Sequence, residues 1–82
     1  MDHDRIHAVQ PQKDPERWKS GIVDSVREAD GHCVVTVEPD EGGEAVDLTV
    51  TFAVRDLFVS RLPIEEGASP AGERIWYRQR GG

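Results

Sequence analysis

Cys33–Val37 reads CVVTV and Val46–Phe52 reads VDLTVTF, with the loop PDEGGE at Pro39–Glu44 between them. Every second side chain in both stretches is apolar, which is the period of a β-strand with one buried face. Acidic residues and paired glycines are typical of a turn. The pattern therefore predicts a β-hairpin at the centre of a small, mostly β domain.

Turn residues on either side of this hairpin predict further short strands. Ala29–Gly31 contains an Asp-Gly pair, which favours a tight turn between a strand at Ile22–Arg27 and a strand at His32–Glu38. A third strand is expected at Ala45–Ala53, and the three strands form an antiparallel meander. Arg74–Arg80 is expected as the last strand of the sheet.

The segments outside these strands divide the chain into a tail and one domain. Residues 1–13 have no apolar period and predict a flexible tail, so the domain is expected over residues 14–80. Asp14–Glu16 resembles a helix start with Pro15 at the first helical position, and a first strand that opens at Trp18 is an equal alternative. Residues 54–62 suit one turn of helix or a bent strand, and a loop is expected from Pro63 to Gly72.

The apolar pattern assigns an inner and an outer face to each strand. Ile75 and Tyr77 of the last strand are expected inside, and Cys33 is expected to be a small buried apolar residue. The other predicted core residues are Ile22, Val23, Val26, Val35, Val37, Val46, Leu48, Val50, Phe52, Leu57 and Leu62. This pattern predicts a mainly β fold, either a small antiparallel five-stranded barrel (SH3-like or OB-like) or a curled sheet, with at most one or two short helical turns.

Composition and charge restrict the classes of function. The chain has 82 residues, a net charge of −6 and one cysteine, so it is expected to be one small acidic domain without an internal disulfide. Residues 21–50 contain one basic and eight acidic side chains, which disfavours non-specific binding to nucleic acid or anionic lipid. No signal-peptide pattern and no apolar run of membrane length is visible, so a cytoplasmic protein that binds no membrane is expected.

The sequence contains no motif of known catalytic chemistry. Its serines lie in no nucleophile motif, and it has neither a phosphate-binding loop nor a dinucleotide fingerprint. His3 and His7, with Asp2 and Asp4, have metal-binding side chains at helical spacing, but a flexible tail provides no scaffold for a zinc site. We therefore expect no enzyme, no cofactor and no metal.

The strand at Arg74–Arg80 is the candidate binding surface. Its outward residues are expected to be Arg74, Trp76, Arg78 and Arg80. A tryptophan among arginines on one strand face can stack a base and bind phosphates, and it can equally bind an acidic or aromatic peptide. A third interpretation is structural: Trp76 covers an end of the barrel while the arginines pair with the acidic middle strands.

The central hairpin resembles the middle of a cold-shock domain, in which two strands flank a similar acidic glycine loop. The resemblance covers Val35–Glu44 and Val46–Phe52 and implies a small β-barrel. That family stacks bases on aromatic residues of both strands. The outward positions here hold a ring only at His32, the others being Val34, Thr36, Asp47, Thr49 and Thr51, so nucleic-acid binding on the hairpin does not follow.

These observations together predict a non-catalytic binding or accessory module. We expect a protein partner at the face of Arg74, Trp76, Arg78 and Arg80 or at an exposed sheet edge, where a second copy of the chain is one alternative. Single-stranded nucleic-acid binding by the same four residues is the second hypothesis.

Overall fold

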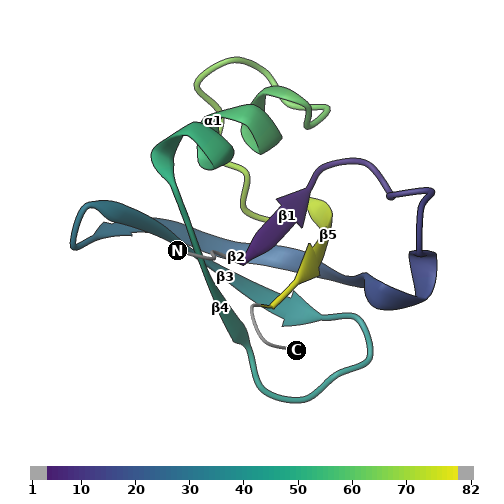
Figure 1. The fold of residues 1–82 in the computed structure, drawn as a ribbon. Helices are drawn as coiled ribbons and strands as arrows, with labels where there is room; N and C mark the ends of the chain where they lie inside the picture. Colours follow the sequence, from purple (N-terminus) through teal and green to yellow (C-terminus); the bar gives the residue numbers. More distant parts are fainter. Residues whose placement is uncertain (1–3, 80–82) are drawn as a thin grey trace.

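A computed structural model of the protein describes residues 4–79, which form one five-stranded antiparallel sheet, one α-helix and a lone 3-10 turn (Figure 1). The strand order is β1-β5-β2-β3-β4, and the sheet curls without closing. The strands are β1 (Arg5–His7), β2 (Lys19–Ala29), β3 (His32–Pro39), β4 (Val46–Val50) and β5 (Arg74–Arg78); the 3-10 turn is η1 (Pro15–Arg17) and the helix is α1 (Phe52–Ser60). The predicted mainly β fold is thus confirmed in its curled-sheet form.

The two predicted hairpins of the meander are both present. Asp30 and Gly31 form a two-residue turn between β2 and β3, and their positive φ angles of 52° and 78° match the preference of an Asp-Gly pair. In the central hairpin Val35 pairs with Leu48, and both side chains are fully buried. The register therefore places the apolar residues of both strands on the same inner face.

A β-bulge in β2 explains which of its apolar side chains are buried. Val23 pairs with Val37, but the next paired residue is Ser25, so Asp24 is an extra residue in this strand. The bulge turns Val26 inward, where it packs against the core. Ile22 lies opposite Glu38 and is only half-buried, so its prediction as a core residue is wrong.

The core lies on the concave side of the curled sheet. Val23 and Tyr77 are among its largest fully buried side chains, and Cys33 is buried as predicted. The other buried residues are Ile6, Val35, Val37, Leu48, Val50, Phe58, Leu62 and Ile75. Strands β2 to β5 supply most of this set, because their alternating pattern places one face of each strand inside.

Strand β1 lies in the segment for which the sequence predicted a flexible tail. Its three residues pair with β5, with Ile6 opposite Tyr77, and Ile6 is buried. The prediction of a tail over residues 1–13 therefore does not hold for Arg5–His7. A single apolar residue between polar neighbours gives no visible period, yet β5 provides a complete set of backbone partners for it.

Asp4 connects the two edge strands of the curled sheet. Its backbone N–H donates to the carbonyl of Thr49 at 3.2 Å, and its carboxylate accepts the N–H of Thr49 at 2.8 Å. These two bonds join the start of β1 to β4 at the other edge. They satisfy backbone groups that an edge strand otherwise leaves open.

Residues 54–62 contain a helix, which resolves the alternative that the sequence left open. The side-chain oxygen of Thr51 accepts the N–H of Val54 and caps the helix, so α1 begins at Phe52. Phe58 is buried, whereas Phe52 and Leu57 are 37% and 51% exposed, so their prediction as core residues is wrong. Helix α1 lies above one end of the sheet (Figure 1). Across residues 4–79 no helix has the length and apolarity needed to cross a membrane.

Candidate functional site

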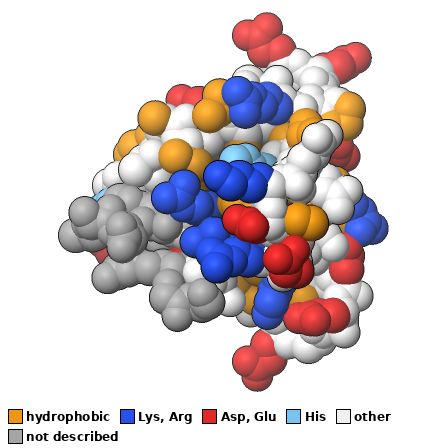
Figure 2. Space-filling view, turned by 45° about the vertical axis from the view of Figure 1, so that its right-hand side comes forward, with side chains coloured by type: hydrophobic (Ala, Val, Ile, Leu, Met, Phe, Trp, Pro, Cys, Tyr) orange, Lys and Arg blue, Asp and Glu red, His pale blue; other side chains and the backbone are white. Residues whose placement is uncertain are grey.

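Basic and aromatic side chains gather on the outer side of β1, β5 and the start of β2. Cross-strand pairs place Arg5 opposite Arg78 and His7 opposite Trp76. We name this surface the arginine–tryptophan face and define it by Arg5, His7, Arg17, Trp18, Arg61, Trp76 and Arg78. Figure 2 shows Lys and Arg side chains grouped around a histidine on this side of the molecule.

Trp18 lies at the centre of the arginine–tryptophan face. Its ring meets that of His7 edge-on, with the ring centres 4.7 Å apart. The guanidinium carbon of Arg78 lies 5.7 Å from the centre of the Trp18 ring, within the range of a cation–π contact. Trp18 follows η1, in which Pro15 occupies the first helical position as the sequence predicted, and it directly precedes β2. The 3-10 turn thus positions this ring beside the strands.

Four arginines of this face lack ion-pair partners among the described residues. Arg5, Arg17, Arg61 and Arg78 form no ion pair with any carboxylate in residues 4–79. Basic residues elsewhere are paired: Lys19 with Glu41, Arg27 with Asp47, and Arg55 with Glu28 and Asp56. Among the described residues outside this face, Lys13 is the exception and the other basic residues are paired, so this cluster of four arginines is available to an anion.

Arg74, a predicted site residue, is held by the acidic loop after β3. Its guanidinium donates to Oδ2 of Asp40, and the hydroxyl of Ser20 donates to the same oxygen at 2.6 Å. Pairing with acidic residues is the structural role that the sequence left open for these arginines, and within residues 4–79 Arg74 has this role. Trp76 and Arg78 lie on the outer face of β5, as predicted, and both are half-buried. Arg80 lies outside the described residues.

His7 lies in a positive environment. Partial burial, followed by the charges of Arg61 and Arg5, lowers the pKa of His7 below its ordinary value. Both arginines therefore act on the same ring, although Arg61 follows α1 and Arg5 belongs to β1. Within residues 4–79 no group of three or more His, Cys, Asp or Glu side chains is placed to bind a metal. His3, the other predicted metal-capable histidine, lies outside that range.

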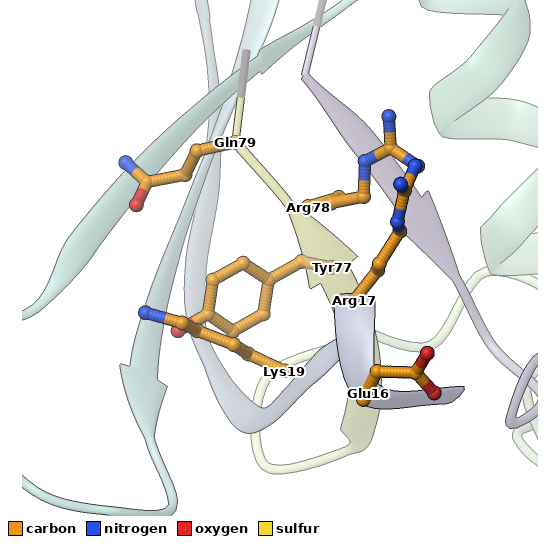
Figure 3. Close-up of a pocket in the computed structure, with 6 residues that line it drawn as sticks. All are labelled: Glu16, Arg17, Lys19, Tyr77, Arg78 and Gln79. Carbon is orange, nitrogen blue, oxygen red and sulfur yellow. The ribbon is translucent and has the colours of Figure 1, made fainter. Parts of the chain in front are cut away.

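Two hollows border the arginine–tryptophan face. The larger one has a volume of about 500 Å³ and lies between η1 and the end of β5. Figure 3 shows Arg17 and Arg78 extending to the same side of this hollow, with Lys19 beside the ring of Tyr77. The smaller one, about 140 Å³, lies between β1 and α1. Both hollows share arginines with the face, so a ligand can contact cations and a recess together.

Sequence reasoning found Trp76 and Arg78 but missed most of this face. The sequence pattern does not decide whether Trp18 follows a helical turn or opens a strand, and it predicts a tail at His7. The only local signal in β1 is that Arg5-Ile6-His7 alternates like the segment Arg74–Arg78, and three residues are too few to establish a period. Arg17 and Arg61 lie outside strands, so no alternation could place them.

A family model describes the chain over nearly its whole length. Residues 1–79 match a family of unknown function, DUF7861, and the chain belongs to this family. No curated protein and no solved structure matches the chain.

Proposed function

We propose that the chain is a non-catalytic binding module that recognises a protein partner through the arginine–tryptophan face. One observation carries the proposal: Arg5 and Arg78 lie directly opposite each other on adjacent strands, with no ion-pair partner among the described carboxylates. Like charges in this position destabilise a sheet. An anionic group of a partner would offset that repulsion.

The composition of the face supports a protein partner. Tryptophan and arginine are enriched at the energetic centres of protein interfaces, and both tryptophans of the chain are half-buried here. The net charge of −6 repels acidic partners from most of the surface, so this face is where an acidic partner approaches at least electrostatic cost.

The small size of the core supports the proposed absence of catalysis. In the described part of the chain eleven buried side chains form one core inside the curled sheet, and the hollows beside the face lie on the surface. A chain of this length buries only about 60–65% of its unfolded surface, so a deep site would remove much of that core.

The test compares two double variants that remove the same number of charges, in affinity purification from cells of the source organism. Arg5→Gln with Arg78→Gln removes two charges from the face, while Arg27→Gln with Arg55→Gln removes two charges elsewhere. We expect the first pair to lose proteins that the wild type and the second pair retain. Equal recovery by both pairs would contradict the proposal.

Single-stranded nucleic acid is a second candidate, favoured by the exposed parts of Trp18 and Trp76 beside unpaired arginines. Four arginines contacting phosphates give a slope of about −3 for log affinity against log salt, at about −0.7 per phosphate. A labelled oligothymidine titrated at several salt concentrations, with Trp fluorescence as readout, tests this. Absence of binding at low salt excludes it.

We further propose that the curled sheet is a partly open barrel of SH3-like or OB-like type and that the protein acts in the cytoplasm. The two Asp4–Thr49 hydrogen bonds support the first statement, because they bring the edge strands together. They also occupy Thr49 at the β4 edge, which makes a homodimer through this edge less favourable. One buried cysteine supports a reducing compartment.

A further inference from the structure

The smaller hollow combines an apolar floor with a cationic rim. It lies between β1 and α1 and has a volume of about 140 Å³. A cavity of about 150 Å³ lined by aliphatic and aromatic side chains accepts a group the size of benzene. The residues around it are Asp4, Arg5, Ile6, His7, Ala8, Val54, Leu57, Phe58 and Arg61. The hollow therefore has room for one apolar side chain of a partner.

Leu57 identifies the part of the hollow that lacks a cover. It precedes the buried Phe58 in α1 and is 51% exposed, although it lines the hollow together with the buried Ile6. Leaving an aliphatic side chain of this size half in water forgoes about 1 kcal/mol of burial free energy. An apolar side chain seated in the hollow would recover part of it.

The positive charges around the hollow favour negative charges on the ligand, beside its apolar side chain. Arg5 and Arg61 form no ion pair with a described carboxylate, and both lower the pKa of His7. Among the residues that the structure describes, Asp4 is the one carboxylate at the rim, and it already accepts the backbone N–H of Thr49. Guanidinium groups bind carboxylates in paired hydrogen bonds, so acidic residues on either side of the apolar anchor complement this rim.

A nucleic acid fits this hollow less well than a peptide. Bases stack on exposed flat rings, but of the two rings that line this hollow Phe58 is buried and His7 is half-buried with its ring against Trp18, while the accessible floor includes the aliphatic Leu57. A peptide supplies one aliphatic or aromatic side chain with carboxylates beside it, which matches the apolar floor and the two unpaired arginines.

We infer that the β1–α1 hollow binds an acidic peptide segment of a partner protein, with one aliphatic or aromatic side chain inserted beside Leu57 and its flanking carboxylates paired with Arg5 and Arg61. This inference rests on the proposed protein-binding function and names the chemistry of its partner.

The experiment selects peptides of about twelve residues from a random displayed library against the full chain. We expect enriched peptides to contain Asp or Glu around a Leu, Ile or Phe. The tightest peptide is then titrated against Leu57→Gln and Arg61→Gln, with Arg27→Gln as a matched control on another face. Both hollow variants should weaken binding at least tenfold, and the control should bind as the wild type does.

The outcomes separate this inference from the proposed function. Leu57 is 51% exposed and Gln is a good helix former, so the variant should still fold, with a melting temperature lowered by about 4–8 °C at most; Arg61→Gln provides a second, independent variant. Peptides that depend on Arg78 and Trp76 but not on Leu57 or Arg61 overturn the inference and leave the proposed function standing. Peptides that depend on neither pair, or no enrichment at all, overturn both. Tight oligonucleotide binding that Arg61→Gln abolishes also overturns the inference.

Discussion

Replacing Gly21 with alanine tests how closely three strands approach in the middle of the sheet. Gly21 lies in β2, opposite Pro39 of β3 and Ile75 of β5, and it is buried. A β-carbon at this position would lie 2.6 Å from Cγ1 of Val37 and 2.7 Å from the carbonyl oxygen of Glu38. The first contact involves a fully buried side chain and the second involves backbone, so neither neighbour can move away freely.

The size of the effect follows from two opposing contributions. Overpacking a core costs about 1–3 kcal/mol, and the backbone contact places Gly21→Ala at the upper end of that range. Alanine also restricts the unfolded chain, which stabilises the protein by about 0.4–1 kcal/mol. The expected net loss is about 2 kcal/mol, or a decrease of about 8–16 °C in melting temperature for a domain of this size.

Urea unfolding followed by circular dichroism measures this loss. An unchanged slope of the unfolding free energy against urea concentration would show that the folded and unfolded states keep their compactness. The matched control is a double-mutant cycle with Val37→Ala. Removing Cγ1 relieves one of the two contacts, so the double variant should be about 1 kcal/mol more stable than the sum of the single changes. A Gly21→Ala protein as stable as the wild type, or strictly additive changes, would refute the reasoning.

Three further predictions concern the helix cap, the strand connection and His7. Thr51→Ala removes the cap of α1 and should cost about 1 kcal/mol in urea unfolding, whereas Thr51→Ser keeps the hydroxyl and should cost less than half of that. Asp4→Ala leaves the N–H of Thr49 without its side-chain acceptor and should cost about 1 kcal/mol, while Asp4→Asn keeps an oxygen acceptor; equal losses would contradict this role. Burial, Arg61 and Arg5 lower the pKa of His7, so the unfolded chain binds a proton more readily and the free energy of unfolding should fall as the pH drops through the ordinary value of 6.5. His7→Gln should flatten this decrease between about pH 7.5 and about pH 5.5, and an unchanged slope would count against it.

The central strands were predictable because their side chains have a period of two. In β3 and β4 the inner face contains buried apolar residues, with Val46 half-buried at its end, so any shift of register by one residue would expose the apolar set. Val26 illustrates the limit of this reasoning. Val23 and Val26 are three residues apart and cannot share a face in a regular strand, but the extra residue Asp24 turns both inward.

The boundary between β4 and α1 could not be predicted from the sequence pattern. The alternation of β4 continues to Phe52, so Thr51 was assigned to the outer face of a strand. Its hydroxyl instead caps the helix, and Phe52 begins α1. A threonine suits both positions, and only the packing of Phe58 on the core decides between them.

The candidate site was predictable only along β5. Alternation placed Trp76 and Arg78 outward, but which side chains join them depends on pairing across the sheet. Arg74 has the same outward position, and the carboxylate that engages it belongs to Asp40 in a distant loop. Neither the cross-strand neighbours of β5 nor the Arg74–Asp40 ion pair can be recognised from a local sequence pattern.

The pairing of β1 with β5 sets an order for folding during synthesis. Ile6 near the start of the chain is paired with Tyr77 near its end, whereas β2, β3 and β4 pair with their immediate neighbours. The meander has the local contacts that form quickly, but β1 leaves the ribosome long before its partner strand exists. Ile75 and Tyr77 are also core residues, so the core is incomplete until β5 emerges. The nascent chain must therefore hold an unpaired strand and an open apolar surface until β5 has emerged, which is the period when a chaperone would have the most to bind.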